Sequence, residues 1–255
     1  MNFSAACVII IYGEVIIRGK SEYDYIKNII RRNYFMCGIV GYIGQRDCTD
    51  VLMQGLEKLE YRGYDSAGIA VFEKTGIKTV KTKGKLADMR HKLDIEGSPV
   101  GHCGIGHTRW ATHGEPSDIN SHPHTNGRVT IVHNGIIENY IELKEFLTEK
   151  GYTFTSQTDT EVVACLLDYY YSERNPLRAI TETLKELKGS YALGIIFRDF
   201  PDRVYATRKE SPLIVGIGEN EYFIGSDIPA FLKYTKKYVL LDDNDIVLSL
   251  IHISE

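Results

Sequence analysis

A methionine followed directly by a cysteine opens the apolar, glycine-punctuated run MCGIVGYIG at residues 36–44. If Met36 were the true start and were removed, Cys37 would carry a free α-amino group beside its thiol. Such an amine titrates near ~8 and a thiol near ~8.5, so the amine can act as the base for its own nucleophile. In this chain, however, 35 residues precede Met36 and would convert that amine into a non-basic amide.

A lone cysteine in an apolar strand usually packs as a small hydrophobic residue, so the interpretation of Cys37 depends on the rest of the chain. Four further runs combine glycines with arginine, histidine, asparagine and acidic residues. They are LEYRGYDSAGIAV at 59–71, GIGHTRWATHGEP at 104–116, VHNGIIENY at 132–140 and TDTEV at 158–162.

Arg109 and Asp159 are of the types that bind the two charged ends of an amino acid. A planar guanidinium matches a carboxylate fork with two parallel hydrogen bonds, although a solvated surface arginine is the ordinary alternative. Asp159 follows Thr158 at the expected start of a helix, where Thr158 caps the helix with Glu161 as its partner. A carboxylate at that place benefits from the helix dipole and can also bind an α-ammonium.

Three other positions have both a plain and a functional interpretation. Asn134-Gly135 and Arg62-Gly63 are most simply turns, but an asparagine amide and a glycine N–H can also stabilise an oxyanion. Trp110 is the only tryptophan and by composition would be a core residue.

Hydrophobic periodicity predicts alternating short strands and helices that position these residues. Expected strands are 38–43, 67–72, 77–81, 103–109, 129–133 and 245–247, with a meander formed by 191–197, 203–207, 213–217 and 222–224. Expected helices are 49–59, 86–93, 139–147, 162–170 and 177–187, and a polar loop is expected between 109 and 129. The pattern indicates a layered α+β fold.

Together with CGIVG, the quoted runs resemble the class II glutamine amidotransferases over roughly residues 36–247. EYRGYDSAG and HTRWATHG favour the glucosamine-6-phosphate synthase branch. The amidophosphoribosyltransferases, which look more like HRGQDSAG and VRYST at those places, are the alternative. The resemblance implies a four-layer αββα sandwich of the N-terminal nucleophile hydrolase type. It also implies hydrolysis of glutamine to glutamate and ammonia by an N-terminal cysteine, without cofactor or metal.

The resemblance also assigns roles to individual positions. The catalytic residues would be Cys37 as nucleophile, with Asn134 and Gly135 as the oxyanion hole. The residues that bind glutamine or shape its pocket would be Arg62, Gly63, Arg109, Trp110, Thr112, His113 and Asp159. Trp110 would close the site and gate the passage of ammonia.

Six of the eight histidines lie within residues 102–133, which raises the alternative of a metal site. No recurring ligand spacing on one helix or strand appears among them, and no CxxC pattern is present. We therefore expect no metal, and we expect His122 and His124 to brace the loop over the site.

An intact synthase would pass the ammonia to fructose-6-phosphate in a second, sugar isomerase domain, and would be a homodimer. We expect such a domain to be missing here, because the sequence changes after Val247 to a tail, 248–255, that resembles a truncation or foreign sequence. The alternative from another class is a catalytically blocked glutamine-binding or RNA-associated module. We interpret residues 1–35 as an extension of doubtful origin, for which an assembly chimera, a misassigned start and a real extension are the alternatives.

Composition excludes several partners. The chain has 255 residues, 43% of them hydrophobic and 25% charged, with a net charge of −4, which favours neither nucleic acid nor an anionic membrane. Its longest apolar runs fall far short of the ~20 residues of a membrane span. Five cysteines at irregular spacing argue against a disulfide framework and favour the cytoplasm.

Overall fold

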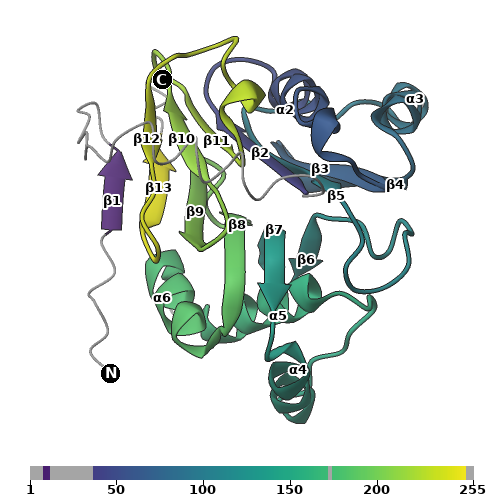
Figure 1. Ribbon diagram of the computed structural model, residues 1–255, viewed down its shortest axis with the longest axis vertical. Coiled ribbons are helices and arrows are strands. Elements are labelled where there is room, and N and C mark those ends of the chain that lie inside the picture. Colours follow the sequence, from purple (N-terminus) through teal and green to yellow (C-terminus); the bar gives the residue numbers. More distant parts are fainter. Residues whose placement is uncertain (1–7, 12–36, 172–173, 251–255) are drawn as a thin grey trace.

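Two β-sheets lie face to face in the computed structural model, which describes residues 8–11, 37–171 and 174–250 (Figure 1). Within these residues the six-stranded sheet has the order β1-β13-β9-β8-β7-β6, and the seven-stranded sheet has the order β12-β10-β11-β2-β5-β3-β4. All the pairings are antiparallel except the parallel pairing of β1 with β13.

The strands of the six-stranded sheet are β1 (Val8–Ile11), β6 (His124–Asn126), β7 (Val129–Ile137), β8 (Gly189–Phe197), β9 (Arg203–Lys209) and β13 (Ile246–Leu250). Those of the seven-stranded sheet are β2 (Gly38–Ile43), β3 (Ser66–Glu73), β4 (Gly76–Lys83), β5 (Cys103–Arg109), β10 (Ile214–Ile217), β11 (Tyr222–Gly225) and β12 (Tyr238–Leu240).

Helices cover the outer face of each sheet. On the seven-stranded sheet these are α2 (Cys48–Glu57) and α3 (Leu86–Glu96), and on the six-stranded sheet α4 (Tyr140–Glu149), α5 (Asp159–Tyr170) and α6 (Pro176–Glu186). Two short 3₁₀ helices, η1 (Glu60–Arg62) and η2 (Ile228–Ala230), complete the described elements. This arrangement confirms the predicted α+β sandwich with helix, sheet, sheet and helix layers.

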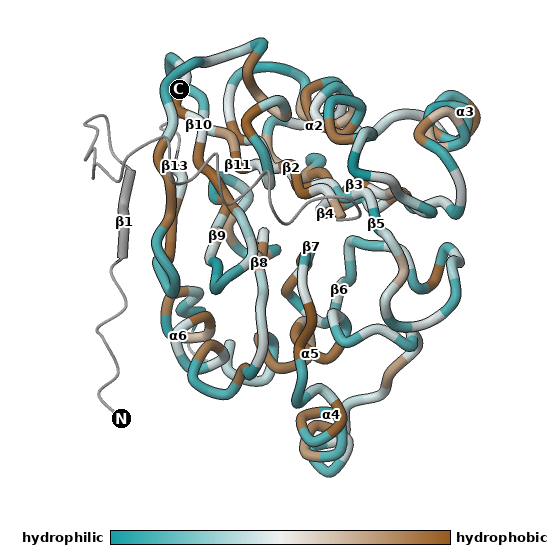
Figure 2. Tube along the Cα trace, viewed as in Figure 1, coloured by the Kyte–Doolittle hydropathy of each residue, from teal (hydrophilic) through white to brown (hydrophobic). Residues whose placement is uncertain are grey.

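The apolar layer between the sheets holds them together. Ile39 and Ile105 from the seven-stranded sheet pack with Val132, Ala192 and Ile196 from the six-stranded sheet, and each of them is fully buried. Alternation along each strand produces this layer, because every second side chain faces the opposite sheet. In Figure 2, hydrophobic stretches follow β2, β13 and α5, while hydrophilic colours mark many of the connecting loops.

Most expected elements are present, and β2 and β5 have the expected bounds. The predicted single meander is wrong: β8 and β9 belong to the six-stranded sheet, whereas β10 and β11 belong to the seven-stranded one. The expected polar loop contains the strand β6, which pairs with β7. Strand β7 also continues through Asn134-Gly135 to Ile137, so these two residues do not form a turn.

Three expectations concern the ends of the chain. Within the extension at residues 1–35 the structure describes only β1, and the rest of this segment lies outside the described residues. Strand β13 continues beyond Val247 and pairs with β9 through Leu250, so the proposed boundary at residue 247 falls inside a strand. The domain limits stay predictions. Across the described part of the chain, no helix is long and apolar enough to span a membrane.

Candidate active site

Cys37 lies directly before β2, half-buried at one end of the seven-stranded sheet. The Trp110 backbone N–H donates to its Sγ at 3.1 Å, and Sγ lies 3.5 Å from the Trp110 carbonyl oxygen. Burial raises the pKa of the Cys37 thiol, and this outweighs the lowering by the Trp110 hydrogen bond and by the charge of Arg109. A thiol with a raised pKa needs a base before it can act as a nucleophile at neutral pH.

Asn134 and Gly135 reach Cys37 from the facing sheet. The Asn134 side chain donates from Nδ2 to the Cys37 carbonyl oxygen at 3.0 Å, and its Oδ1 lies 2.9 Å from His107 Nε2. Gly135 has φ +126°, and a Cβ there would lie 2.1 Å from the Ser190 carbonyl oxygen. Only glycine satisfies this backbone, because other residues rarely adopt such angles and the carbonyl leaves no room for a side chain.

Arg109, the last residue of β5, has a buried guanidinium beside the same pocket. Its Nη2 donates to the carbonyl oxygens of His113 and, at 3.1 Å, of Gly114. Its Nη1 is also buried and has no hydrogen-bond partner among the described residues. The two carbonyls therefore fix the guanidinium and leave one of its nitrogens without a hydrogen bond.

Asp159 is the first residue of α5 and is buried. Its Oδ2 accepts the backbone N–H of Ile137 at 2.9 Å, while its Oδ1 lies 3.9 Å from His133 Nδ1. Thr158 caps α5 as expected, by accepting the Glu161 N–H. The Glu161 carboxylate, however, binds Thr155 and Ser156 instead of returning to Thr158, so the reciprocal partnership expected there is wrong.

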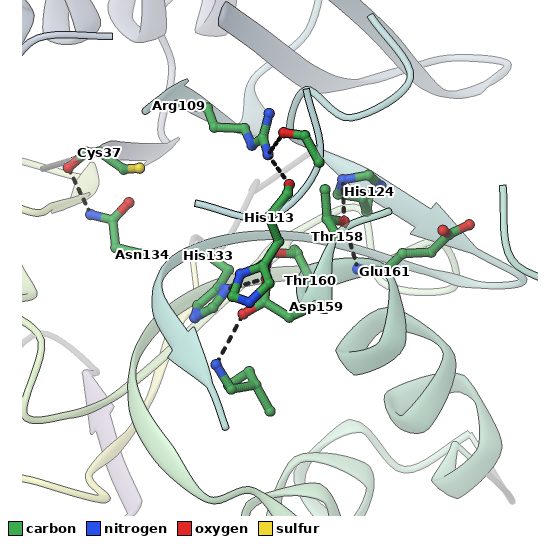
Figure 3. Close-up of polar contacts among 12 residues, drawn as sticks. Cys37, Arg109, His113, His124, His133, Asn134, Thr158, Asp159, Thr160 and Glu161 are labelled. Carbon is green, nitrogen blue, oxygen red and sulfur yellow. Dashed lines mark hydrogen bonds and ion pairs between the residues drawn. The ribbon is translucent and has the colours of Figure 1, made fainter. Parts of the chain in front are cut away.

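A single pocket joins these groups (Figure 3). Its lining combines a thiol, a cation and a carboxylate with hydroxyl and imidazole groups: Cys37, Arg109, Trp110, Thr112, His122, His133, Gly135, Thr158, Asp159 and Thr160.

Four of the predicted site residues, Asn134, His113, Arg62 and Gly63, are not among those that line the pocket. Asn134 touches Cys37, as described above, and His113 supports Arg109 through its carbonyl while its ring packs edge-on against Tyr140 at 5.0 Å. Arg62 is buried at the end of η1, with Nη1 3.6 Å from Asp227. Gly63 follows it at φ +76°, and its N–H binds Glu60.

The exposure of Trp110 contradicts the prediction from composition that it is a core residue. Its side chain is 40% exposed, so it is not a core residue, although it lines the pocket. Its backbone N–H donates to Cys37 Sγ. A gating role for Trp110 stays a prediction.

The residues that sequence reasoning missed are mostly next to predicted ones. His133 and Thr160 line the pocket, and His133 Nδ1 lies 2.9 Å from Thr160 Oγ1. His122 and His124 were expected only to brace a loop, yet His122 lines the pocket as well, and His124 Nε2 lies 3.0 Å from Thr158 Oγ1. Because side chains alternate along a strand, His133 and its neighbour Asn134 point to opposite faces of β7. This alternation is the sequence signal that distinguishes the two positions.

The buried histidines of this region are kept neutral by their surroundings. Burial lowers the pKa of His107 and of His124 to about 3, and it also lowers the pKa values of His122 and His133. Among the described residues, no group of three or more His, Cys, Asp or Glu side chains is arranged to hold a metal ion.

Comparison with known proteins gives a matching family model and similar sequences. A family model described as a glutamine amidotransferase domain matches residues 107–233. The glutamine–fructose-6-phosphate aminotransferase (isomerizing) of Clostridium tetani is 58% identical over 215 residues, 84% of this chain and 35% of that protein. The corresponding protein of Thermus thermophilus is 52% identical over 217 residues, 83% of this chain and 35% of its own length. The chain thus spans about a third of the length of the curated relatives it matches.

Solved structures show the same fold at low sequence identity. The glutamine phosphoribosylpyrophosphate amidotransferase of B. subtilis, complexed with ADP and GMP, superposes with a TM-score of 0.69 at 24% identity. That match covers 86% of this chain and 50% of the other. A glutamine aminotransferase class-II domain protein from Silicibacter pomeroyi gives a TM-score of 0.57 at 12% identity, covering 84% and 99% of the two chains.

Proposed function

The chain belongs to the glutamine amidotransferase family, and we propose that its pocket hydrolyses glutamine to glutamate and ammonia with Cys37 as the nucleophile. One observation carries this assignment. The Cys37 thiol shares a pocket with the buried Arg109 and Asp159, which have opposite charges. An α-amino acid has one carboxylate and one ammonium, so these two groups can hold its main chain while its side chain meets the thiol.

The substrate's α-carboxylate would bind the available Nη1 of Arg109, and Thr112 would add a hydroxyl donor. The α-ammonium would bind Asp159, whose Oδ2 is fixed by Ile137. Arg62, Gly63 and His113 act from behind the pocket, where they shape the start of β2 and the loop after β5. Trp110 would cover the bound glutamine from the exposed side.

The chemical step follows from the contacts of Cys37. Its sulfur attacks the side-chain amide carbon, forming a C–S bond while the C=O π electrons move to oxygen. The thiol proton passes to a base and then to the departing nitrogen, so that ammonia leaves as the C–N bond breaks. Water then attacks the resulting γ-glutamyl thioester, which releases glutamate and regenerates the thiol.

Asn134 and Gly135 would stabilise the oxyanion of both tetrahedral intermediates. A primary amide nitrogen carries two hydrogens, and Asn134 Nδ2 uses one of them for the Cys37 carbonyl. The second N–H, together with the Gly135 backbone N–H, is then available to the oxyanion. Each such donor typically contributes roughly 3–4 kcal/mol to the transition state.

The base is the amine of Cys37 itself if the mature chain begins there. The raised pKa of the thiol makes a base necessary. An α-amine that titrates near ~8 meets this need, and an amide bond to Met36 does not.

In a longer protein we propose fructose-6-phosphate as the ammonia acceptor, as in the reaction that the relatives' names describe. Their 52–58% identity favours this acceptor over that of the phosphoribosylpyrophosphate amidotransferases, whose 24% identity supports the fold alone. A homodimer and a cytoplasmic location belong to the same proposal.

The test is release of glutamate and ammonia in equal amounts from glutamine. Cys37→Ala should abolish both products, whereas Cys48→Ala, which removes a buried thiol of α2 away from the pocket, should retain them. Saturable glutamine binding without either product would contradict the proposal and would favour the blocked glutamine-binding module.

A further inference from the structure

A polar pair interrupts the apolar layer between the two sheets next to Cys37. Along β5, Ile105 faces the other sheet, and His107 follows two residues later on the same face; along β7, Val132 is followed in the same way by Asn134. His107 and Asn134 are 0% and 2% exposed, and their side chains meet at 2.9 Å. A buried polar contact at this place is costly unless both groups are satisfied.

The hydrogen-bond pattern fixes both side chains in one state. Asn134 Nδ2 donates to the Cys37 carbonyl, so the atom facing His107 is Oδ1, which can only accept. His107 must therefore carry its hydrogen on Nε2. The flipped amide would place Oδ1 against the Cys37 carbonyl oxygen, and two acceptors would then face each other.

The His107 ring is also held in place. It packs against His122 with ring centroids 4.2 Å apart and an interplanar angle of 32°. Burial lowers its pKa to about 3, so the ring stays neutral in ordinary buffers and offers one N–H donor. Its Nδ1 meets no hydrogen-bond partner in good geometry among the described residues, although the nearby His133 backbone also favours a proton on the ring. Asn134 is the side chain to which the ring is hydrogen-bonded.

We infer that His107 is a positioning residue of the oxyanion hole: its Nε2–H holds the Asn134 amide in the orientation that directs one N–H to the Cys37 carbonyl and the other to the reacting oxygen. The inference rests on the proposed function and extends it by one residue. No mechanistic step passes through His107, which acts through Asn134 alone. Without the bond, the amide could rotate, and its second N–H would be misdirected for part of the time.

Three substitutions separate this role from simple packing. Glutamine places its amide nitrogen near the position of imidazole Nε2, asparagine is too short to do so, and leucine has no donor. We expect His107→Leu and His107→Asn to lower kcat about 10- to 100-fold, by analogy with the loss seen when hydrogen-bond partners that orient metal ligands are removed. KM should change little, and His107→Gln should recover most of kcat.

A double substitution tests whether the effect passes through Asn134. In an Asn134→Ala background, His107→Leu should cause no further loss of kcat, because the group that His107 orients is already gone. Equal losses of kcat in His107→Gln and His107→Leu, or losses that multiply in the double variant, would overturn the inference.

Crystal structures of the wild type, His107→Leu and His107→Gln make failure of this inference distinguishable from failure of the proposed function. The Asn134 amide should leave the Cys37 carbonyl in His107→Leu and keep its bond in His107→Gln. An unmoved amide in His107→Leu would overturn the positioning role, whatever the turnover. A wild type that releases no ammonia, with the amide moved in His107→Leu, would overturn only the glutaminase assignment.

Discussion

The backbone N–H of Trp110 lies 3.1 Å from the Sγ of Cys37. This contact joins Trp110, the residue after β5, to Cys37, the residue before β2. Arg109 directly precedes Trp110 and lines the same pocket as Cys37. A hydrogen bond to sulfur favours the thiolate, but burial opposes it more strongly. The pocket therefore holds the thiol of Cys37, the proposed nucleophile, in place without favouring its thiolate.

The raised thiol pKa gives a pH dependence that can be measured in the chain that retains residues 1–36. The folded pKa lies above the ordinary value, so the thiolate fraction at any pH is smaller than in a free peptide. Alkylation of Cys37 by iodoacetamide, followed by peptide mass spectrometry, should have its midpoint above the ~8.5 of a free thiol. A midpoint at or below the free-thiol value would contradict the dominance of burial.

Asn134→Ala should lower kcat about 100- to 1,000-fold and leave KM within a few-fold, because the amide contributes to the transition state more than to the bound substrate. Steady-state ammonia release gives both constants. Asn126→Ala on β6, away from the pocket lining, is the matched control and should behave as the wild type. A rise in KM with an unchanged kcat would show that Asn134 binds substrate instead.

Arg109→Lys should raise KM for glutamine about 10- to 100-fold, because an ammonium cannot reproduce the planar fork that bonds the loop carbonyls and a carboxylate together. Glutamate release measured across glutamine concentrations tests this. Arg90→Lys changes an exposed arginine paired with Glu57 and should leave KM unchanged. Equal KM values in the two variants would exclude Arg109 from substrate binding.

Glu161 is predicted to stabilise the loop before α5. Its carboxylate accepts bonds from the N–H and hydroxyl of Thr155, at 2.9 and 2.8 Å, and of Ser156, at 2.6 and 2.7 Å. Burial alone would raise its pKa, but these bonds hold the pKa below its usual value. Glu161→Gln replaces one acceptor oxygen by a donor, and should lower the free energy of unfolding by about 1–3 kcal/mol at pH 7.

The sign of the pH dependence follows from the depressed pKa of Glu161. Its stabilisation is complete above the unfolded value of ~4.3 and is lost as the pH falls through the lower folded value. Urea unfolding at pH 7, 5 and 4 should therefore show the wild-type advantage over Glu161→Gln shrinking only below about pH 4.3. Glu145→Gln on the exposed face of α4 should have little effect, and a difference that grows on acidification would contradict the assignment.

Periodicity predicted most elements because the apolar alternation of β2 and β5 and the helical stripe of α5 are local signals. It could not predict the partner of each strand, since β9 and β10 have similar patterns and yet join different sheets. The short β6 lies among polar residues and left no signal. Asn134-Gly135 resembled a turn in the sequence. Gly135 continues β7 with a positive φ while it pairs with β8, and the sequence pattern does not show that pairing.

The candidate site positions stand out in the sequence because their motifs are contiguous, and the structure places Cys37, Arg109 and Asp159 at one pocket. Their catalytic and binding roles stay predictions. His107 was not assigned a role, since a histidine in an apolar strand has no partner visible in the sequence. Its contact with Asn134 exists only because β5 and β7 face each other across two sheets. Such contacts between sheets are the part of a site that local patterns do not encode.

The most direct test of the central claim combines intact mass and N-terminal sequencing of the purified chain with its rate of ammonia release from glutamine. We predict that turnover accompanies a terminus at Cys37, where the thiol that Trp110 holds has its own amine as base. Turnover by a chain that still begins at Met1 would contradict the amine as base. A chain that begins at Cys37 and releases no ammonia would contradict the glutaminase assignment itself.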